Sequence, residues 1–323
     1  MADKWKQTAL LVIDMQNDFI REDGLMRVDG GKAIVPNVIK VVEIARQRGV
    51  LVVWVVREHD SLGRDVELFR QHLYSAGKVG PTSKGSKGAK LVDGLVMKER
   101  DYKVVKTRFS AFFNTHLHSF LQTEGIKSLV IVGVQTPNCI RQTVFDAVAL
   151  DYANVSVIVD ATAAATPDVH VGWIESRWRE SHCPNVIKAV EIARQRGILV
   201  IWVVRENDSL GRDVELFRRH MYSAGKVGPA SKGSKGAELV DGLMMKERDY
   251  KVVKTRFSAF FNTHLHSFLQ TEGIKSLVIV GVQTPNCIRQ TVFDAVGLDY
   301  ANVSVIVDAT AAATPDVHVG MFS

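Results

Sequence analysis

A near-perfect internal repeat limits what this chain can fold into more than any other feature of its sequence. Residues 36–172 align with residues 184–320 at a constant offset of 148, with ten mismatches in 137 positions. A period of this length makes each copy as large as a domain, unlike the short units of solenoid proteins. Residues 1–35 precede the first copy, whereas only residues 173–183 separate the two copies. The pattern is that of a tandem duplication that left out the first segment.

We therefore divide the chain into a complete domain over residues 1–172, a junction over residues 173–183, and a second copy over residues 184–323. The second copy has no counterpart of the apolar segment "ALLVID" at 9–14. We expect this copy to be poorly folded, rearranged or dependent on a borrowed strand. Both copies end soon after "TPDVHVG", and the junction sequence "WIESRWRE" is expected to add a helix to the first copy.

The composition excludes several classes of protein. Of the 323 residues, 46% are apolar, and no apolar run approaches the roughly 20 residues that span a bilayer. The net charge of +6 comes from scattered lysines and arginines, without the basic, aromatic-interleaved stripe typical of nucleic-acid binding. Three cysteines form no disulfide framework, and the N-terminus shows no signal-peptide pattern. We expect a cytoplasmic protein that acts on a small molecule, with no cofactor and no nucleic-acid or membrane partner.

Short apolar runs alternate with helical patterns along the first copy. Strands are expected at 9–14, 50–56, 102–106, 128–134 and 155–160, and helices within 34–49, 112–125 and 139–152. This alternation predicts an α/β fold, in which helices cover both faces of a parallel sheet in a Rossmann-like, three-layer arrangement. The chain would hold one complete copy of that fold and one incomplete copy. Ligands of such folds bind beyond the carboxyl ends of the strands.

Three of the expected strands lead to residues that can carry out chemistry. The first ends at Asp14, the third ends at Lys106, and the fourth runs into Cys139. In "TPNC", Thr136 can cap a helix and Pro137 suits its first position, so Cys139 falls in the first turn. The helix dipole there would favour the thiolate. Asp14 could accept the thiol proton, and Lys106 could orient the carboxylate.

Each of these residues also has a purely structural interpretation. A cysteine at a helix start is often a small buried apolar residue. An aspartate after a strand often caps a turn, and a lysine there is usually solvated. Three such residues converging on one edge of the sheet favour a functional site.

Three segments together resemble the isochorismatase-like cysteine hydrolases. They are "ALLVIDMQNDF", "KTRFSAFFNT" and "GVQTPNCIRQTVFDA", and they occur in the family's order through the first copy. The sequence is most similar to plant-type isochorismatase-like hydrolases and ureidoacrylate amidohydrolases. The resemblance implies a catalytic triad of Asp14, Lys106 and Cys139, and a cis peptide bond at Val134–Gln135. It also implies an oxyanion hole formed by the amides of Gln135 and Cys139, and it suggests self-association into a homo-oligomer.

The family resemblance implies cleavage of an amide or ureido C–N bond through an acyl-enzyme on Cys139. Two alternatives are open: a vinyl-ether hydrolase of the isochorismatase type, and an inactive relic with a role in assembly. Nicotinamidases of the family carry a metal cluster after the second strand. Here His59 and Asp60 stand without the other histidines, and the second copy has Asn207 in place of His59, so we expect no metal. His116 and His118 lie two apart on an expected helix and cannot chelate together.

Substrate contacts are less sharply indicated by the sequence. Phe109 and Phe112 could line a pocket, and Arg57 could bind a substrate carboxylate through a bidentate pair. A solvated loop arginine is the slightly favoured alternative for Arg57.

The second copy repeats the nucleophile and the lysine but not the base. Lys254 and Cys287 are the equivalents of Lys106 and Cys139, whereas the offset equivalent of Asp14 is Thr162. One aspartate cannot serve two cysteines at once. We therefore expect one competent site per chain, with Lys254 and Cys287 inactive.

Overall fold

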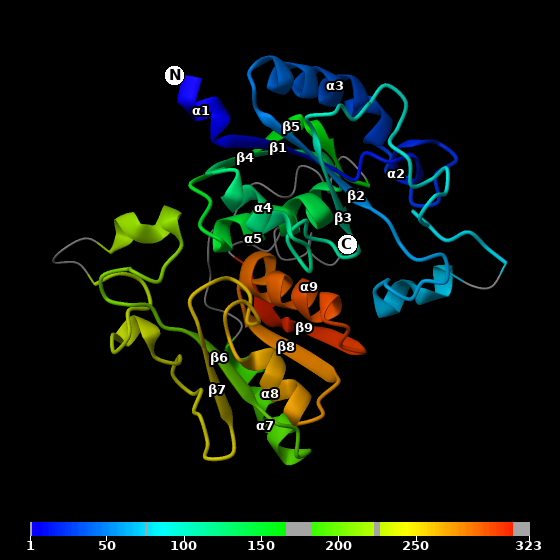
Figure 1. The fold of residues 1–323 in the computed structure, drawn as a ribbon. Helices are drawn as coiled ribbons and strands as arrows, with labels where there is room; N and C mark the ends of the chain where they lie inside the picture. Colours follow the sequence, from blue (N-terminus) through cyan, green and yellow to red (C-terminus); the bar gives the residue numbers. More distant parts are fainter. Residues whose placement is uncertain (1, 75–76, 166–182, 223–226, 313–323) are drawn as a thin grey trace. The chain divides into compact units, whose positions relative to one another are not determined.

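The chain folds into two compact units, Met1–Trp173 and Ile174–Ser323. The computed structural model describes residues 2–74, 77–165, 183–222 and 227–312 (Figure 1). The helix expected from "WIESRWRE" lies outside the described residues. Each unit is treated separately below.

Unit 1 contains the parallel sheet that the sequence predicts. Its five strands lie in the order β3-β2-β1-β4-β5, so the first strand is central. All four neighbouring pairs are parallel. The strands span Thr8–Ile13 (β1), Leu51–Arg57 (β2), Tyr102–Lys106 (β3), Ser128–Val134 (β4) and Asn154–Ala163 (β5).

Helices cover both faces of this sheet, with α3 on one side and α4 and α5 on the other (Figure 1). The helices span Ala2–Lys6 (α1), Asn17–Ile20 (α2), Gly31–Gln47 (α3), Leu117–Thr123 (α4) and Arg141–Ala149 (α5). A 3-10 helix spans Leu68–Leu73, within the segment "DVELFRQHLY", and a π-helical turn at Thr136–Ile140 precedes α5.

Helix α4 begins five residues later than the expected start at residue 112. The Thr115 hydroxyl donates to the Ala111 carbonyl and accepts from the Leu117 N–H at 3.3 Å. A side chain that bonds locally to the backbone offers an alternative to helix hydrogen bonds. Thr115 therefore holds the preceding residues in turns and marks the helix start.

Strand β1 lies in the middle of the core. All six of its residues are buried, and it pairs with β2 on one side and β4 on the other. Its side chains at Leu10 and Val12 belong to the hydrophobic cluster that packs against α3. Burying an aliphatic side chain of this size contributes about 1.5–3 kcal/mol. Strand β1 thus joins the two halves of the sheet.

Unit 2 keeps the local elements of the repeat but not a single sheet. Its strands form two separate two-stranded sheets, β6-β7 and β8-β9. Between them, the described residues supply no equivalent of β1. The strands span Ile201–Arg205 (β6), Tyr250–Lys254 (β7), Ser276–Val282 (β8) and Asn302–Ala311 (β9). The helices span Cys183–Gln195 (α7), Leu265–Thr271 (α8) and Arg289–Gly297 (α9), with shorter helical turns at Leu216–Met221, Lys235–Ala237 and Thr284–Ile288.

The missing strand leaves identical side chains in different surroundings. Val134 is fully buried at the end of β4, whereas its equivalent Val282 in β8 is 53% exposed. Strand β6 is also two residues shorter than β2, because Leu51 and Val52 pair only with β1 in unit 1. Among the described residues, the second copy therefore has two small sheets where the first copy has one continuous sheet.

A matched pair of glycine substitutions tests the central position of β1. A Cβ added to Gly133 would lie 2.0 Å from the Ile13 carbonyl oxygen, whereas one added to Gly281 meets nothing within 4 Å. Both glycines have φ above +110°, so backbone strain of about 1–3 kcal/mol is common to both variants. We expect Gly133→Ala to lower the free energy of unfolding by about 1–3 kcal/mol more than Gly281→Ala, because only the former overpacks against β1. Urea denaturation measures both, and equal losses would contradict the assignment.

Candidate active site

Asp14 directly follows β1 at the carboxyl end of the sheet. Its backbone is in the left-handed region, with φ of +54°, and its N–H donates to the Val55 carbonyl at 2.9 Å. A non-glycine residue held in this conformation needs support from its surroundings, and such residues concentrate at functional sites. The side chain is 1% exposed. Strand β1 and its neighbour β2 therefore fix the carboxylate inside the protein.

Lys106, at the end of β3, joins Asp14 to Cys139. Its Nζ lies 2.9 Å from Asp14 Oδ2 and 3.4 Å from Cys139 Sγ. The same ammonium donates to the Arg108 carbonyl at 3.1 Å. Lys106 is 1% exposed and Cys139 is 7% exposed. The structure thus brings together the three residues that the sequence singles out, although 125 positions separate Asp14 from Cys139.

Cys139 lies in the π-helical turn between β4 and α5. The peptide bond Val134–Gln135 just before this turn is cis, as the family resemblance implies. The Thr143 hydroxyl donates to the Cys139 carbonyl at 2.7 Å and accepts from the Ala111 N–H at 3.0 Å. These bonds hold the backbone of the thiol against the loop that follows β3. The oxyanion role of the Gln135 and Cys139 amides stays a prediction.

The environment of Cys139 corrects the expectation of a thiolate favoured by the helix dipole. Burial and the negative charge of Asp14 raise the pKa of the thiol, and the cations Lys106 and Arg57 only partly oppose this shift. Desolvation disfavours the charged form of any acid. The resting thiol is therefore protonated at neutral pH, and its activation requires a base.

Arg57 is not the solvated loop residue that the sequence slightly favours. It is 1% exposed and pairs with the fully buried Glu67 at 3.2 Å. Its guanidinium donates to the Arg108 carbonyl at 2.9 Å and lies 3.9 Å from Cys139 Sγ. Arg57 thus shares the Arg108 carbonyl with Lys106. Glu67 was not singled out from the sequence, where its signal is an acid flanked by the apolar residues Val66 and Leu68 in "DVELF".

The two phenylalanines predicted to line a pocket lie in different places. Phe109 stacks with Phe69, and the Arg57 guanidinium lies 5.6 Å from the centre of its ring. Phe109 is therefore next to the cations that face Cys139. Phe112 instead packs against Tyr152 at a ring distance of 5.7 Å. Its contacts place it in an aromatic cluster beside α4.

The residues after β2 do not fit a metal ion. His59 Nε2 lies 3.5 Å from the Arg57 guanidinium, and burial together with this cation lowers the pKa of His59 to about 4. Asp60 forms an ion pair with Arg64 at 2.6 Å. No group of three or more potential ligand side chains occurs among the described residues. A guanidinium fixed beside the imidazole repels a second cation.

His116 and His118, which are predicted not to chelate together, contact different tyrosines. His116 Nε2 lies 2.9 Å from the Tyr102 hydroxyl, and His118 Nδ1 lies 3.1 Å from the Tyr152 hydroxyl. Each imidazole is thus part of a different aromatic contact.

Unit 2 repeats two members of the site without the third. Lys254 Nζ lies 3.4 Å from Cys287 Sγ, as in unit 1. Its other contacts are the carbonyls of Arg256 and Phe257, at 2.7 and 2.9 Å. Burial lowers the pKa of Lys254. Thr162, the offset equivalent of Asp14, belongs to unit 1, where it pairs with Gly133 in the sheet.

This fold and this site define the class of protein. The family model for the isochorismatase domain matches the chain twice, over residues 8–177 and residues 171–323. The chain therefore belongs to the isochorismatase family, as the three sequence segments suggested, and the double match agrees with a tandem duplication.

Several relatives are known by name. A protein of Arabidopsis thaliana named probable inactive nicotinamidase is 74% identical over 171 residues, which are 53% of this chain and 87% of the relative. The ureidoacrylate amidohydrolase RutB of Klebsiella pneumoniae is 29% identical over 58% of this chain and 90% of its own length. A solved isochorismatase family protein from Desulfovibrio vulgaris is 38% identical with a TM-score of 0.49, over 59% of this chain and 92% of that chain.

Within the part of the chain that the structure describes, no helix is both long and apolar enough to cross a bilayer.

Alkylation of Cys139 tests the charges around the thiol. The tryptic peptides carrying Cys139 and Cys287 have the same sequence, so the measurement requires a Cys287→Ala background. We expect the rate with iodoacetamide to rise with an apparent pKa above the ordinary value of about 8.5 for a thiol. Asp14→Asn should lower this pKa, because the carboxylate raises it, whereas Lys106→Met should raise it further. An apparent pKa below 7 in the parent would contradict this environment.

Proposed function

We propose that unit 1 is a metal-independent cysteine hydrolase that cleaves a C–N bond of a small amide or ureido substrate. The observation that carries this proposal is the contact of one buried ammonium with both a carboxylate and a thiol, at 2.9 and 3.4 Å. An ion pair that served stability alone would not need a thiol beside its ammonium group. Three titratable groups converging in this way have the geometry of an activated nucleophile and its base.

In the proposed mechanism, Asp14 removes the thiol proton of Cys139 as the sulfur attacks the substrate carbonyl. Lys106 holds the carboxylate in place and stabilises the thiolate as it forms. The C–N bond then breaks, and the leaving amine or ammonia takes the proton from Asp14. Water, deprotonated by the same carboxylate, hydrolyses the thioester and releases the acid product and the free thiol.

The raised pKa of Cys139 fits a base-dependent mechanism. A thiol that stays protonated at rest gains nucleophilicity only when the substrate is bound and the proton has an acceptor. During attack, negative charge moves from sulfur to the carbonyl oxygen. The amides of Gln135 and Cys139 are proposed to stabilise this oxyanion.

The relatives support an amide or ureido substrate. One relative is named a ureidoacrylate amidohydrolase, an enzyme whose name describes hydrolysis of a ureido substrate. The Arabidopsis relative is named a probable inactive nicotinamidase, and nicotinamide is not the substrate that we propose. The buried thiol of Cys139 and the half-buried thiol of Cys287 are both free, which suits a reducing compartment such as the cytoplasm.

A matched pair of cysteine variants tests the proposed nucleophile. Ammonia release is measured over a panel of small amides and ureides, first with the parent chain to find a substrate. Cys139→Ala should abolish turnover, because the acyl-enzyme cannot form. Cys287→Ala should retain nearly the parent rate, since no carboxylate equivalent to Asp14 occurs beside that thiol among the described residues. Equal losses from the two variants would contradict a single site in unit 1.

The base and the lysine are tested in the same assay. Asp14→Asn should reduce kcat about 10²–10⁴-fold, the usual contribution of a general base. Lys106→Met should also reduce kcat strongly, whereas the matched change Lys254→Met in unit 2 should leave it near the parent value. Removing one partner of a buried ion pair costs stability, about 3–5 kcal/mol, so circular dichroism must show that each variant is folded at the assay temperature. A folded Asp14→Asn variant with the parent kcat would eliminate Asp14 as the base.

A further inference from the structure

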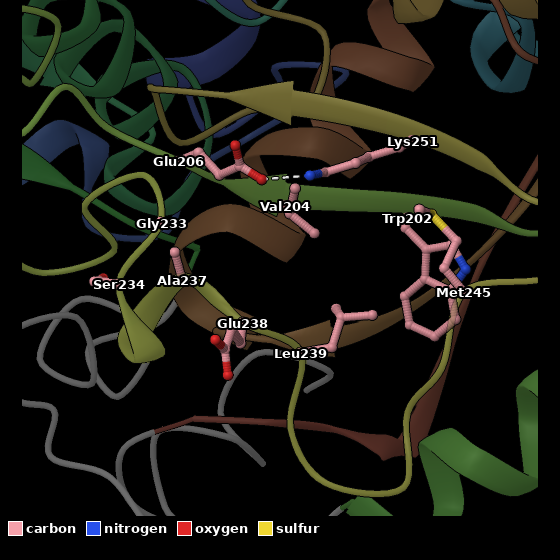
Figure 2. Close-up of a pocket in the computed structure, with 10 residues that line it drawn as sticks. All are labelled: Trp202, Val204, Glu206, Gly233, Ser234, Ala237, Glu238, Leu239, Met245 and Lys251. Atoms are coloured by element: carbon pink, nitrogen blue, oxygen red, sulfur yellow. Dashed lines mark hydrogen bonds and ion pairs between the residues drawn. The ribbon is translucent and has the colours of Figure 1, made fainter.

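Unit 2 contains a pocket of about 260 Å³ beside β6. Figure 2 shows Trp202, Val204 and Leu239 around it, with the Glu206–Lys251 ion pair along one side. Its lining is mainly side chains of β6 and the loop after the short helix Lys235–Ala237. Neither Cys287 nor Lys254 of this unit lines the pocket.

The repeat shows what occupies the same place in unit 1. The pocket residues Ala237, Glu238 and Leu239 are the equivalents of Ala89, Lys90 and Leu91. In unit 1, the residues that follow β1 bond to this stretch of backbone. Gln16 donates to the Ala89 carbonyl at 2.7 Å, the Asn17 N–H donates to the Lys90 carbonyl at 2.9 Å, and Gln16 forms a bridge with Leu91.

Two pairs of equivalent glycines differ in their surroundings at the same place in the two units. In unit 1, a Cβ on Gly133 would meet the Ile13 carbonyl at 2.0 Å, and one on Gly88 would meet the Asp18 carboxylate at 2.0 Å. In unit 2, a Cβ added to Gly281 would meet nothing within 4 Å, and one added to Gly236 would have its nearest neighbouring atom at 3.8 Å. The space taken by residues 13–18 in unit 1 is therefore open in unit 2.

The walls of this space are β6 and β8. Strand β8 has the same sequence as β4, and β6 differs from its counterpart only at Ile201, which replaces Val53. Both walls are partly uncovered: Val278 in β8 is 63% exposed, and no residue of β8 is buried. A strand edge with unpaired backbone groups readily pairs with an added strand.

We propose that unit 2 binds, between β6 and β8, the segment Thr8–Asn17 of a second copy of this chain. The occupant follows from the repeat, because walls of the same sequence select the same strand in the same register. Each chain has this segment once and two places for it, so a chain that keeps its own segment in unit 1 can complete unit 2 only with the segment of a second chain, whose unit 1 then gives it up. Leu10 would lie opposite Val278, as it lies opposite Val130 in unit 1.

Exchange of the segment conserves its strand pairing. The segment gives up pairing with β2 and β4 and gains the same pairing with β6 and β8 of another chain, so the fraction exchanged depends on chain concentration. Transfer would also carry Asp14 toward Lys254, the lysine whose Nζ now bonds to two carbonyls. The binding itself does not depend on the proposed hydrolase activity.

Disulfide trapping tests both the occupant and its register. The probe is a synthetic peptide of residues 7–20 carrying Leu10→Cys, and the receptor is the full chain carrying Val278→Cys. Neighbouring strands lie about 4.8 Å apart, which is within the roughly 4.4–6.8 Å between Cα atoms that a disulfide spans. The control peptide carries Leu11→Cys, whose side chain points to the other face of the strand. Residues 278 and 287 share one tryptic peptide, so the receptor also carries Cys287→Ala. We expect at least a tenfold excess of the Leu10→Cys product, identified by the mass of the Val278→Cys peptide.

The second wall is followed by hydrogen exchange. Peptides from β6 differ in mass from those of β2 because of Ile201 and Asn207, so the two units are resolved. Binding of the unmodified peptide should slow exchange in Ile201–Arg205. Absence of crosslinking, equal crosslinking by both peptides, or unchanged exchange in β6 would overturn the proposed strand site.

The source of the segment is tested with two full-length chains. A chain with Leu10→Cys is refolded together with a chain with Val278→Cys and oxidised. A disulfide-linked dimer joining residues 10 and 278 is expected, with a yield that rises with chain concentration. Crosslinking by the peptide without any such dimer would overturn a second copy as the donor, and a linkage within one chain carrying both substitutions at high dilution would do the same.

Discussion

The whole arrangement depends on the backbone pairing of β1 with strands on both of its sides. In unit 1, this strand joins β2 to β4 and makes one sheet of five. The last of its hydrogen bonds, from the Asp14 N–H to the Val55 carbonyl, also fixes the residue that faces the thiol. Where the strand is missing, the same flanking sequences form two small sheets, and a lysine and a cysteine meet without a carboxylate. One strand thus provides both the continuity of the fold and the base of the site.

The site itself shows how burial and charge combine. Asp14 and Lys106 are removed from water together, which is tolerable because each neutralises the other. Burial and the charge of Asp14 raise the pKa of the adjacent thiol, and the cations Lys106 and Arg57 only partly oppose this shift. Arg57 is held near the sulfur by the buried Glu67. The chemistry therefore depends on two buried ion pairs, Asp14–Lys106 and Arg57–Glu67, whose cations both face the sulfur.

The sequence predicted the sheet and the meeting of Asp14, Lys106 and Cys139 at one of its edges, because both follow from local patterns. Apolar runs such as "VLVVWVV" have no solvent face, which is typical of a central parallel strand, and strands of one direction deliver their terminal residues to one edge. The state of the thiol and the burial of Arg57 could not be predicted in this way. They depend on partners brought in by folding, such as Glu67, and the sequence contains no spacing rule for such contacts. The later start of α4 has a local cause in Thr115, which a closer inspection of side-chain bonding could have found.

The most direct test of this account counts the working thiols in one chain. An activated phenyl ester acylates a competent cysteine independently of the natural substrate, and the first turnover releases the phenolate in a fast burst. The account predicts a burst of one equivalent per chain, because only the cysteine beside β1 has both a base and a lysine. A burst of two equivalents would contradict the requirement for the strand and its aspartate, and the absence of any burst would contradict the nucleophile.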